Sequence, residues 1–227
     1  MDDKRIHVLV ATPSVGQMKT RYCTSLIRMY DYFIRNPVLG QEEKSREIAY
    51  AVIEGSMIGS AREQFVNDVL KGEFTHLLFI DEDMGFREDC LNILLSRQMP
   101  LVGANYKMKV PPCHFTARHI NGKEWLPTTA DSTSLEQVLF SGFGFCLIDR
   151  EVLEATQEPR FLALWNDENK VYTTEDLPFF KKAYEAGYPA YIDHKVSKRV
   201  YHVGNWYYSY DNDFPEILKH PAAERAK

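Results

Sequence analysis

The chain has 227 residues, of which 44% are hydrophobic and 26% charged, and its formal net charge is −5 at pH 7. This is the composition of a folded globular protein, and the length favours one large domain over two. The acidic balance excludes a general basic surface for nucleic acid, so only the local clusters Lys107/Lys109 and Lys195/Lys198/Arg199 leave a DNA substrate open.

Cysteine spacing and hydropathy favour a cytoplasmic protein. The chain contains four cysteines, which are far apart and form no C-x-x-C pair, as expected of reduced thiols. The first residues lead into only a short apolar run, and nothing later approaches the roughly 18 apolar residues of a membrane span. We therefore expect a soluble cytoplasmic protein without a membrane span.

The first hundred residues alternate between predicted strands and helices. Apolar runs predict four strands, at residues 6–11, 48–53, 75–80 and 101–106. Helical spacing predicts helices at 19–35, at 60–72 and at 87–97. The second of these begins with a Ser60–Glu63 capping box and stops at Gly72. Strands joined through helices imply right-handed crossovers and a largely parallel sheet.

The second half of the chain has fewer regular patterns. Residues 107–134 contain three prolines and no clear periodicity, so we expect an extended section. Residues 138–148 predict one strand interrupted by two glycines, which indicate a bulge or the close approach of a ligand to the backbone. Thr174 predicts the N-cap of a helix that stops at Gly187, and residues 191–192 resemble a short strand.

An acidic run, Asp81-Glu82-Asp83, directly follows the predicted strand at 75–80. In parallel sheets, ligands bind at the carboxyl ends of the strands. Because side chains alternate along a strand, we expect Asp81 and Asp83 on one side and Glu82 on the other. Two carboxylates on one side suit a hard divalent cation. A solvated acidic loop is the alternative interpretation.

Three chemistries use an Asp-x-Asp pair. A calcium loop of the EF-hand type requires Gly at its sixth position and Glu at its twelfth, where this chain has Phe86 and Asn92. An aspartyl phosphatase resembling the haloacid dehalogenases requires Thr or Val at the fifth position after the first strand, whereas Gly85 follows the third. The third chemistry is a nucleotide-sugar site, where the acids hold a divalent ion against a diphosphate.

Six ordered blocks resemble the GT-A glycosyltransferases, in particular small stand-alone bacterial or phage enzymes of the family-2-like and mannosylglycerate-synthase-like groups. The blocks are VLVATPSVGQM, SAREQFVNDVL, THLLFIDEDMGF, SGFGFCLIDREVL, TEDLPFFKKAYEAGY and VYHVG. The resemblance implies an α/β GT-A fold, Rossmann-like, with a mostly parallel central sheet flanked by helices. It implies a single domain over 1–227, with a nucleotide-sugar-binding half at 1–106, an acceptor-side half at 107–204 and a tail at 205–227.

The same resemblance implies a metal-dependent glycosyltransferase that moves a hexosyl or pentosyl group from a nucleoside-diphosphate sugar, with a UDP-sugar favoured. It assigns Asp83, Asp81 and His202 to the metal. Two carboxylates with one imidazole favour Mn²⁺ over Ca²⁺, with Mg²⁺ as the alternative metal. His194 is the competing histidine, and a hydrogen-bonded structural role is the other interpretation of His202.

The resemblance also assigns contacts to the donor and the acceptor. The implied donor contacts are Thr12, Pro13, Arg62, Asp81, Asp83 and Gly142. A cation in the first turn of a helix opposes the helix dipole, so Arg62 is expected to have a partner. Asp176 and Glu175 are the implied catalytic acids, one of which acts on the acceptor as general base, although acids are also common at helix N-termini. Trp165 and Trp206 are candidate acceptor contacts, with packing as the alternative.

Two other functions stay open. A sugar-nucleotide nucleotidyltransferase has a related fold but carries a glycine-rich loop after the first strand, where TPSVGQMKTR has one glycine. A non-catalytic nucleotide- or glycan-binding domain is expected to lose an acid, whereas Asp81, Asp83, Asp176 and His202 are all present. The acceptor is left open between a glycan, a small metabolite and a modified DNA base, and the oligomeric state is not predicted.

Overall fold

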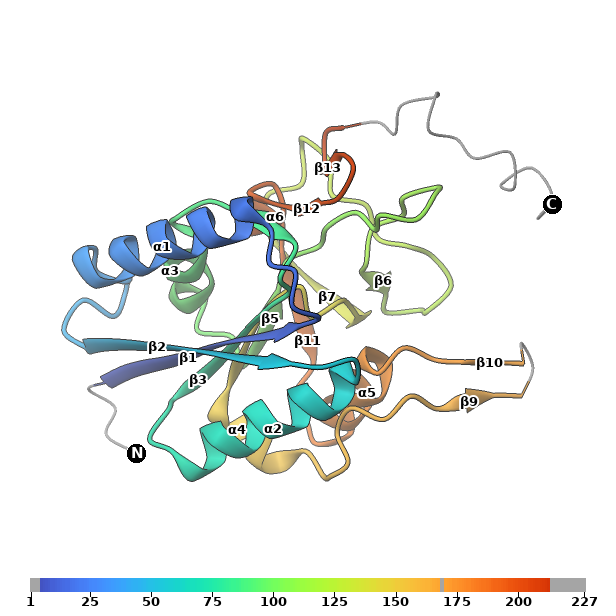
Figure 1. Cartoon of the computed structure of the whole chain (residues 1–227), viewed down its shortest axis with the longest axis horizontal. Coiled ribbons are helices and arrows are strands. Elements are labelled where there is room, and N and C mark those ends of the chain that lie inside the picture. Colours follow the sequence, from blue (N-terminus) through green and yellow to red (C-terminus); the bar gives the residue numbers. More distant parts are fainter. Residues whose placement is uncertain (1–4, 168–169, 213–227) are drawn as a thin grey trace.

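A central sheet of eight strands, in the order β2-β1-β3-β8-β5-β11-β7-β6, organises this computed structural model (Figure 1). The structure describes residues 5–167 and 170–212. The strands of the sheet are β1 (Arg5–Ser14), β2 (Ser45–Glu54), β3 (His76–Ile80), β5 (Leu101–Gly103), β6 (Arg118–His119), β7 (Leu135–Phe140), β8 (Phe145–Asp149) and β11 (Ala190–Asp193).

The strand directions confirm the expected α/β fold with a mostly parallel sheet. Strands β1, β2, β3, β5, β11 and β6 run in one direction, whereas β8 and β7 run in the other. The antiparallel strand β8 lies between β3 and β5. The carboxyl ends of β1 and β3 therefore meet at one edge of the sheet, where parallel sheets usually bind ligands.

Helices cover both faces of the sheet (Figure 1). One apolar cluster joins the sheet to α1 (Thr20–Arg35), α3 (Cys90–Ser96) and α6 (His194–Ser197). The other joins it to α2 (Ile58–Lys71), α4 (Arg150–Ala155) and α5 (Asp176–Glu185). Burial on both faces explains why β1 and β3 are continuous apolar runs. None of the helices in the described residues has the length and hydropathy needed to cross a membrane.

Two small sheets were not predicted. One is antiparallel, in the order β13-β12-β4, and consists of β4 (Met84–Phe86), β12 (Val200–Val203) and β13 (Tyr207–Tyr208). In this sheet His202 pairs with Met84, which directly follows the acidic run. The other is a hairpin of β9 (Trp165–Asn166) and β10 (Val171–Tyr172). The predicted tail at 205–227 thus includes β13, and its residues 213–227 lie outside the described residues.

The two predicted helix caps are wrong. Helix α2 begins at Ile58, so Ser60 lies within its first turn, and no side chain caps the helix. The Glu63 carboxylate instead accepts hydrogen bonds from the backbone N–H of Arg160, at 2.8 Å, and from its guanidinium. Helix α5 begins at Asp176 without a side-chain cap, so Thr174 does not have the predicted role either. In both helices the residue that suggested the cap does not occupy the N-cap position, which is Met57 in α2 and Glu175 in α5.

The predicted strand at 138–148 is two strands. The chain leaves β7 beside β11, passes through residues 141–144 and enters β8 between β3 and β5. A Cβ atom at Gly142 or Gly144 would collide with the Tyr106 hydroxyl. The two glycines therefore allow this connection to pass against a buried tyrosine. The predicted strand at 101–106 ends at Gly103, and the predicted helix at 87–97 shortens to α3.

Candidate functional site

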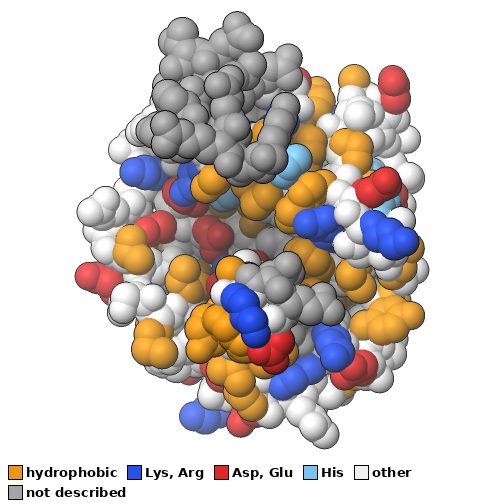
Figure 2. Space-filling model, turned by 90° about the vertical axis from the view of Figure 1, so that its right-hand side faces the viewer, with side chains coloured by type: hydrophobic (Ala, Val, Ile, Leu, Met, Phe, Trp, Pro, Cys, Tyr) orange, Lys and Arg blue, Asp and Glu red, His pale blue; other side chains and the backbone are white. Residues whose placement is uncertain are grey.

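A cavity of about 190 Å³ opens where β1 and β3 end. Its walls come from the β1–α1 loop, the start of α2, the β3–β4 turn, the segment after Tyr106 and β12. Acidic side chains are visible in a depression on this side of the molecule, with hydrophobic and basic side chains around it (Figure 2). The residues that line the cavity are Pro13, Ser14, Val15, Ile58, Asp81, Glu82, Asp83, Lys109 and His202.

The three consecutive acids form a tight turn and do not continue the strand. Strand β3 ends at Ile80, and the backbone N–H of Met84 donates to the carbonyl of Asp81 at 3.1 Å. Strand alternation therefore does not apply, and the prediction that Glu82 faces the opposite side from Asp81 and Asp83 is wrong. All three acids line the cavity, but each has different partners.

Glu82 holds the loop that follows β1. Its carboxylate accepts hydrogen bonds from the Ser14 hydroxyl at 2.5 Å and from the backbone N–H groups of Val15 at 3.2 Å and Gln17 at 3.3 Å. Its carbonyl accepts a further bond from the Lys19 N–H at 3.1 Å. These charge-assisted bonds tie the exposed loop to the acidic turn and stabilise its conformation. Glu82 is therefore partly buried and directed toward this loop and the cavity.

Asp83 lies between a lysine and a histidine. The Lys109 ammonium forms an ion pair with Asp83 Oδ2, and Nε2 of His202 lies 3.9 Å from Asp83 Oδ1. The backbone carbonyl of Asp83 accepts a hydrogen bond from the Val203 N–H at 2.7 Å, which attaches β12 to the turn. The small sheet therefore brings His202 to the acids across more than a hundred residues of sequence.

The protonation of the His202 ring follows from its hydrogen bond. Nδ1 lies 2.6 Å from the carbonyl oxygen of Lys107 and must carry the hydrogen, because a carbonyl only accepts. Nε2 then presents its lone pair toward Asp83, which is the usual arrangement of a histidine ligand. Burial lowers the pKa of this imidazole, with the Asp83 carboxylate acting in the opposite direction. Asp83 and His202 therefore suit a divalent ion as two of its ligands.

The third predicted metal ligand faces a different group. Asp81 Oδ1 lies 3.2 Å from Nη2 of Arg62. Within residues 5–167 and 170–212, no three His, Cys, Asp or Glu side chains are gathered closely enough to hold a metal ion. Asp83 and His202 are therefore the two predicted ligands that lie near one another, whereas Asp83 is also paired with Lys109 and Asp81 is bonded to Arg62.

Arg62 connects the acidic turn to the start of α5. Its side chain is only 3% exposed, and Nη1 contacts Glu175 Oε1 at 2.8 Å and the carboxylate of Asp176. Together with the Asp81 contact, one buried guanidinium bridges three carboxylates, and we name this group the Arg62 cluster (Arg62, Asp81, Glu175 and Asp176). The guanidinium also lies over the ring of Phe143, at 4.9 Å from its centroid. Arg62 therefore has the partner that its position in the helix led us to expect. That partner is a group of three carboxylates next to the cavity.

Charges within the Arg62 cluster shift its pKa values in opposite directions. Burial opposes the charge of Arg62, but the three carboxylates outweigh it and raise the pKa of the guanidinium, which stays protonated. Burial raises the pKa of Asp176 to about 7, and Arg62 opposes that rise. A carboxyl with a pKa near neutrality exchanges protons readily at physiological pH, which is the property of a general base or acid.

Tyr106 packs beside this cluster. Its hydroxyl accepts a hydrogen bond from the Gly144 N–H at 2.7 Å, and its ring lies edge-on to His202 with centroids 4.7 Å apart. Burial and the nearby acids Asp81 and Asp176 raise its pKa, so the phenol stays protonated. Tyr106 occupies the space beside Gly142, the glycine predicted to contact the donor.

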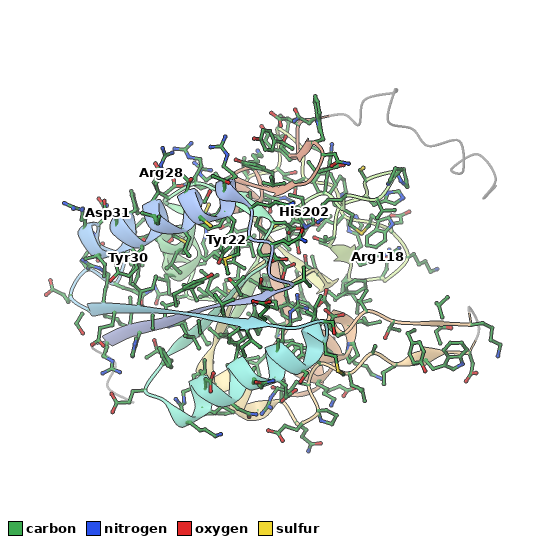
Figure 3. The ribbon with its side chains drawn as sticks, in the orientation of Figure 1. Tyr22, Arg28, Tyr30, Asp31, Arg118 and His202 are labelled. Atoms are coloured by element: carbon green, nitrogen blue, oxygen red, sulfur yellow. The ribbon has the colours of Figure 1, made fainter. Side chains whose placement is uncertain are left out.

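The remaining predicted residues lie in different surroundings. Pro13 lines the cavity, whereas Thr12 is fully buried and its hydroxyl lies 2.5 Å from that of Tyr22, between α1 and the sheet (Figure 3). Trp165 and Trp206 are exposed and lie on the β9–β10 hairpin and in the β12–β13 turn, outside the cavity lining.

The competing histidine is already bonded at both ring nitrogens. Nδ1 of His194 lies 3.0 Å from the Thr128 hydroxyl, and Nε2 lies 3.0 Å from Glu136. Its ring is buried at the start of α6. These contacts give His194 a structural role and leave His202 as the histidine at the acidic turn.

Three residues of the site are not identifiable from the sequence pattern. From the sequence, Lys109 is recognisable only as part of a basic cluster, and Tyr106 only as the end of a predicted strand. Glu82 was expected on the side of the strand opposite to the two aspartates. A lysine within the irregular section 107–134 gives no local signal of its position. Only the isolated glycines 142 and 144 indicate a close approach, without identifying the tyrosine.

Comparisons with known proteins agree with this architecture. No protein-family model and no curated protein sequence matches the chain. The chain is similar in structure to A197 from STIV, with a TM-score of 0.58 and 20% identity over 95% of this chain and 100% of that one. At that identity, the likeness establishes a shared fold.

Two further solved structures match at lower similarity. One is S. aureus TarS 1–349, with a TM-score of 0.44 and 11% identity over 87% of this chain and 60% of that one. The other is the nucleoside-diphosphate-sugar pyrophosphorylase from Vibrio cholerae RC9, with a TM-score of 0.47 and 12% identity over 88% and 97%.

Proposed function

We propose that this protein is a metal-dependent glycosyltransferase that moves a sugar from a nucleoside-diphosphate sugar to a hydroxyl acceptor. The observation that carries the proposal is the Arg62 cluster, which joins Asp81 of the acidic turn to Glu175 and Asp176 of the TED block. A transfer reaction requires donor and acceptor groups side by side, and this cluster connects the blocks that the GT-A resemblance assigns to each.

The cavity provides the donor side. Asp83 and His202 would hold a divalent ion, with Mn²⁺ favoured because carboxylate and imidazole donors suit it. When bound, the ion neutralises the charge that develops on the departing diphosphate. Lys109 adds a second cation at the same place and would contact the phosphates. Pro13 and the loop held by Glu82 form the opposite wall, where a UDP-sugar would place its nucleoside.

Asp176 provides the acceptor side. Burial raises the pKa of its carboxyl to about 7, so the deprotonated form is well populated near neutral pH and accepts a proton from the acceptor hydroxyl. Arg62 fixes the carboxylate in place and leaves its other oxygen for the acceptor. Glu175 contacts the same guanidinium and is the alternative base. The exposed Trp165 and Trp206 would contact the acceptor outside the cavity.

The two alternative functions have weaker support. A nucleotidyltransferase binds triphosphate through free N–H groups after the first strand, whereas the amides of Val15 and Gln17 donate to Glu82. A non-catalytic binder has no use for a buried acid with a pKa near neutrality beside the cavity. Both alternatives predict nucleotide-sugar binding without transfer, so activity separates them from the proposal.

A donor screen tests the proposal directly. UDP-, GDP- and TDP-sugars are incubated with Mn²⁺, nucleotide release is measured, and Mn²⁺ binding is followed by calorimetry. Asp83→Ala is expected to lose both Mn²⁺ binding and nucleotide release, because it removes an anionic ligand. His202→Ala should raise the Mn²⁺ concentration required, whereas His194→Ala should not. Full activity of Asp83→Ala, or in the presence of a chelator, would refute the metal role.

The base is tested separately. Asp176→Asn should retain Mn²⁺ and donor affinity but lose transfer by about 10²–10⁴-fold, the usual contribution of a positioned base. Glu175→Gln identifies which of the two acids faces the acceptor. Glu185→Gln, an exposed acid near the other end of α5, is the matched control and should be neutral. Normal turnover of both site variants would remove the acceptor-side role.

The class of acceptor can be tested by the salt dependence of its binding. Within the two basic clusters, Lys109 and Arg199 are paired with the carboxylates of Asp83 and Asp89, which leaves fewer uncompensated cations for a DNA backbone. A glycan or a small metabolite is therefore favoured over a modified DNA base. A DNA acceptor predicts binding that weakens steeply with salt, whereas an uncharged acceptor predicts little change.

A further inference from the structure

Strand β2 is a long, regular strand with only one neighbour. All ten of its residues pair with β1 in an unbroken parallel register, from Ser45 opposite Arg5 to Glu54 opposite Ser14. In the described part of the chain no strand pairs with its other edge. Figure 1 shows β2 along one side of the molecule, between α1 and α2. Edge strands are usually protected by a bulge, a proline or inward charges because they pair readily with other strands.

The surface around this edge is apolar. Tyr50 and Val52 of β2 are 42% and 38% exposed, and Ile27 and Tyr30 of α1 are 70% and 50% exposed. Between the strand and the helix lies an apolar groove of about 220 Å³, whose lining includes Leu26 and these two α1 residues. Contiguous exposed apolar surface of this kind marks a contact with another molecule.

The side chains of β2 are complementary to themselves. Arg46, Ile48, Tyr50, Val52 and Glu54 lie on one face because strand side chains alternate. Arg46 and Glu54 are each four residues from Tyr50, on opposite sides. Among the described residues, neither has an ion-pair partner of opposite charge. In an antiparallel pairing centred on Tyr50, each Arg46 faces Glu54 of the other copy, and each Ile48 faces Val52. Opposite charges and branched apolar pairs at facing positions stabilise antiparallel strands.

We propose that β2 pairs with β2 of a second copy of this chain, antiparallel and about a two-fold axis at Tyr50, so that one sheet continues through both copies. An isologous contact requires a surface that complements itself, and the arginine–tyrosine–glutamate spacing meets that condition. A strand of a different protein has no need of this symmetry, so a second copy is the favoured occupant. The inference is independent of the proposed function.

Cysteine cross-linking tests the register. Residues that face each other across an antiparallel pair have Cα atoms about 4.5–5.5 Å apart, within reach of a disulfide. Tyr50→Cys should therefore form a covalent dimer under mild oxidation. Val52→Cys is the matched control, because the two copies of residue 52 would lie more than about 13 Å apart. Mixing Ile48→Cys with Val52→Cys should form only the mixed dimer. Equal cross-linking of Val52→Cys alone would overturn the register.

Charge reversal tests the complementarity by sedimentation equilibrium. Arg46→Glu and Glu54→Arg should each weaken the dimer by at least about tenfold, because two facing pairs become repulsive at once. The double variant restores opposite charges at both ends and should dimerise like the wild type. Circular dichroism checks that each variant is folded, which matters for Arg46 because its guanidinium also donates to the carbonyls of Phe33 and Ile34. A monomeric wild type, or a folded double variant that fails to recover, would overturn the proposal.

Discussion

Replacing Arg62 by methionine removes the only cation in direct contact with the three carboxylates of the Arg62 cluster within the described residues. The guanidinium is 3% exposed and lies 3.2 Å from Asp81, 2.8 Å from Glu175 and in contact with Asp176. Methionine keeps an unbranched apolar stem but no charge. Breaking a buried ion pair by removing one partner costs about 3–5 kcal/mol, because the other charges stay buried without compensation. Against a total stability of about 5–15 kcal/mol, Arg62→Met should be folded but fragile.

The loss should depend on pH in a defined direction. In the variant the pKa of Asp176, already raised to about 7 by burial, loses the opposing effect of Arg62 and rises further. The folded variant then holds more protons than the unfolded chain above about pH 4, so its stability falls as pH rises, by up to about 1.4 kcal/mol per pH unit and proton. Above about pH 7 the stability of the wild type no longer falls with pH through Asp176, whereas the stability of the variant should continue to fall.

Urea denaturation near pH 5 and near pH 8 measures the effect through the midpoint and the slope. Arg62→Met combined with Asp176→Asn should recover part of the loss at the higher pH, because one buried charge is removed. Arg160→Met is the matched control, since that buried arginine pairs with Glu63 away from the cluster, and its cost should not grow in the same way. A loss below about 1 kcal/mol, equal at both pH values, would refute the role of Arg62 as the counter-charge of the three carboxylates.

Two further predictions concern groups outside the proposed chemistry. Nε2 of His76 lies 3.3 Å from Asp149. Burial lowers the pKa of His76 from 6.5 to about 4 and raises that of Asp149 from 3.8 to about 7. On unfolding, His76 therefore gains a proton and Asp149 loses one between about pH 4 and 6.5, and the two effects on the pH dependence of stability cancel there. The variant Asp149→Asn should therefore lose stability as pH falls from about 6.5 to 4. The variant His76→Gln should lose stability as pH rises from about 4 to 7. If the thermal stability of both variants followed the pH dependence of the wild type, this prediction would be contradicted. Gly142→Ala should cost about 1–3 kcal/mol in urea denaturation, because the new methyl collides with the Tyr106 hydroxyl. Adding Tyr106→Phe removes that oxygen and should cost less than the sum of the two changes, whereas additive costs would argue against the collision.

Local patterns in the sequence determined most of the first half of the fold. Strands β1 and β3 are buried on both faces, so they appear as continuous apolar runs, and α1 and α2 carry one apolar face each. Such patterns depend on neighbours within a few residues, so they can be recognised from the sequence without knowledge of the fold. The position of the acids at the end of β3 followed from the same reasoning, since a charged run can only follow a buried strand where the strand reaches the surface.

Only the tertiary structure decided which side chains meet at that surface. Arg62 lies 19 residues from Asp81, 113 from Glu175 and 114 from Asp176, and no local pattern connects positions so far apart. The division of the predicted strand at 138–148 also depends on a distant residue, because the buried Tyr106 leaves no room for a Cβ atom at positions 142 and 144 of the connection.

The Ser60–Glu63 capping box and the acidic turn were misjudged because local residue types do not fix the partner of a side chain. Capping preferences contribute about 1 kcal/mol, and the carboxylates of Glu63 and Glu82 bind groups far away in the sequence instead. Glu63 binds Arg160, 97 residues away, in place of a helix end. The sequence by itself therefore determined the elements and the edge of the sheet where acids gather. The partners of each acid were decided by packing, because an ion pair depends on the distance between side chains in space and not on their separation along the chain.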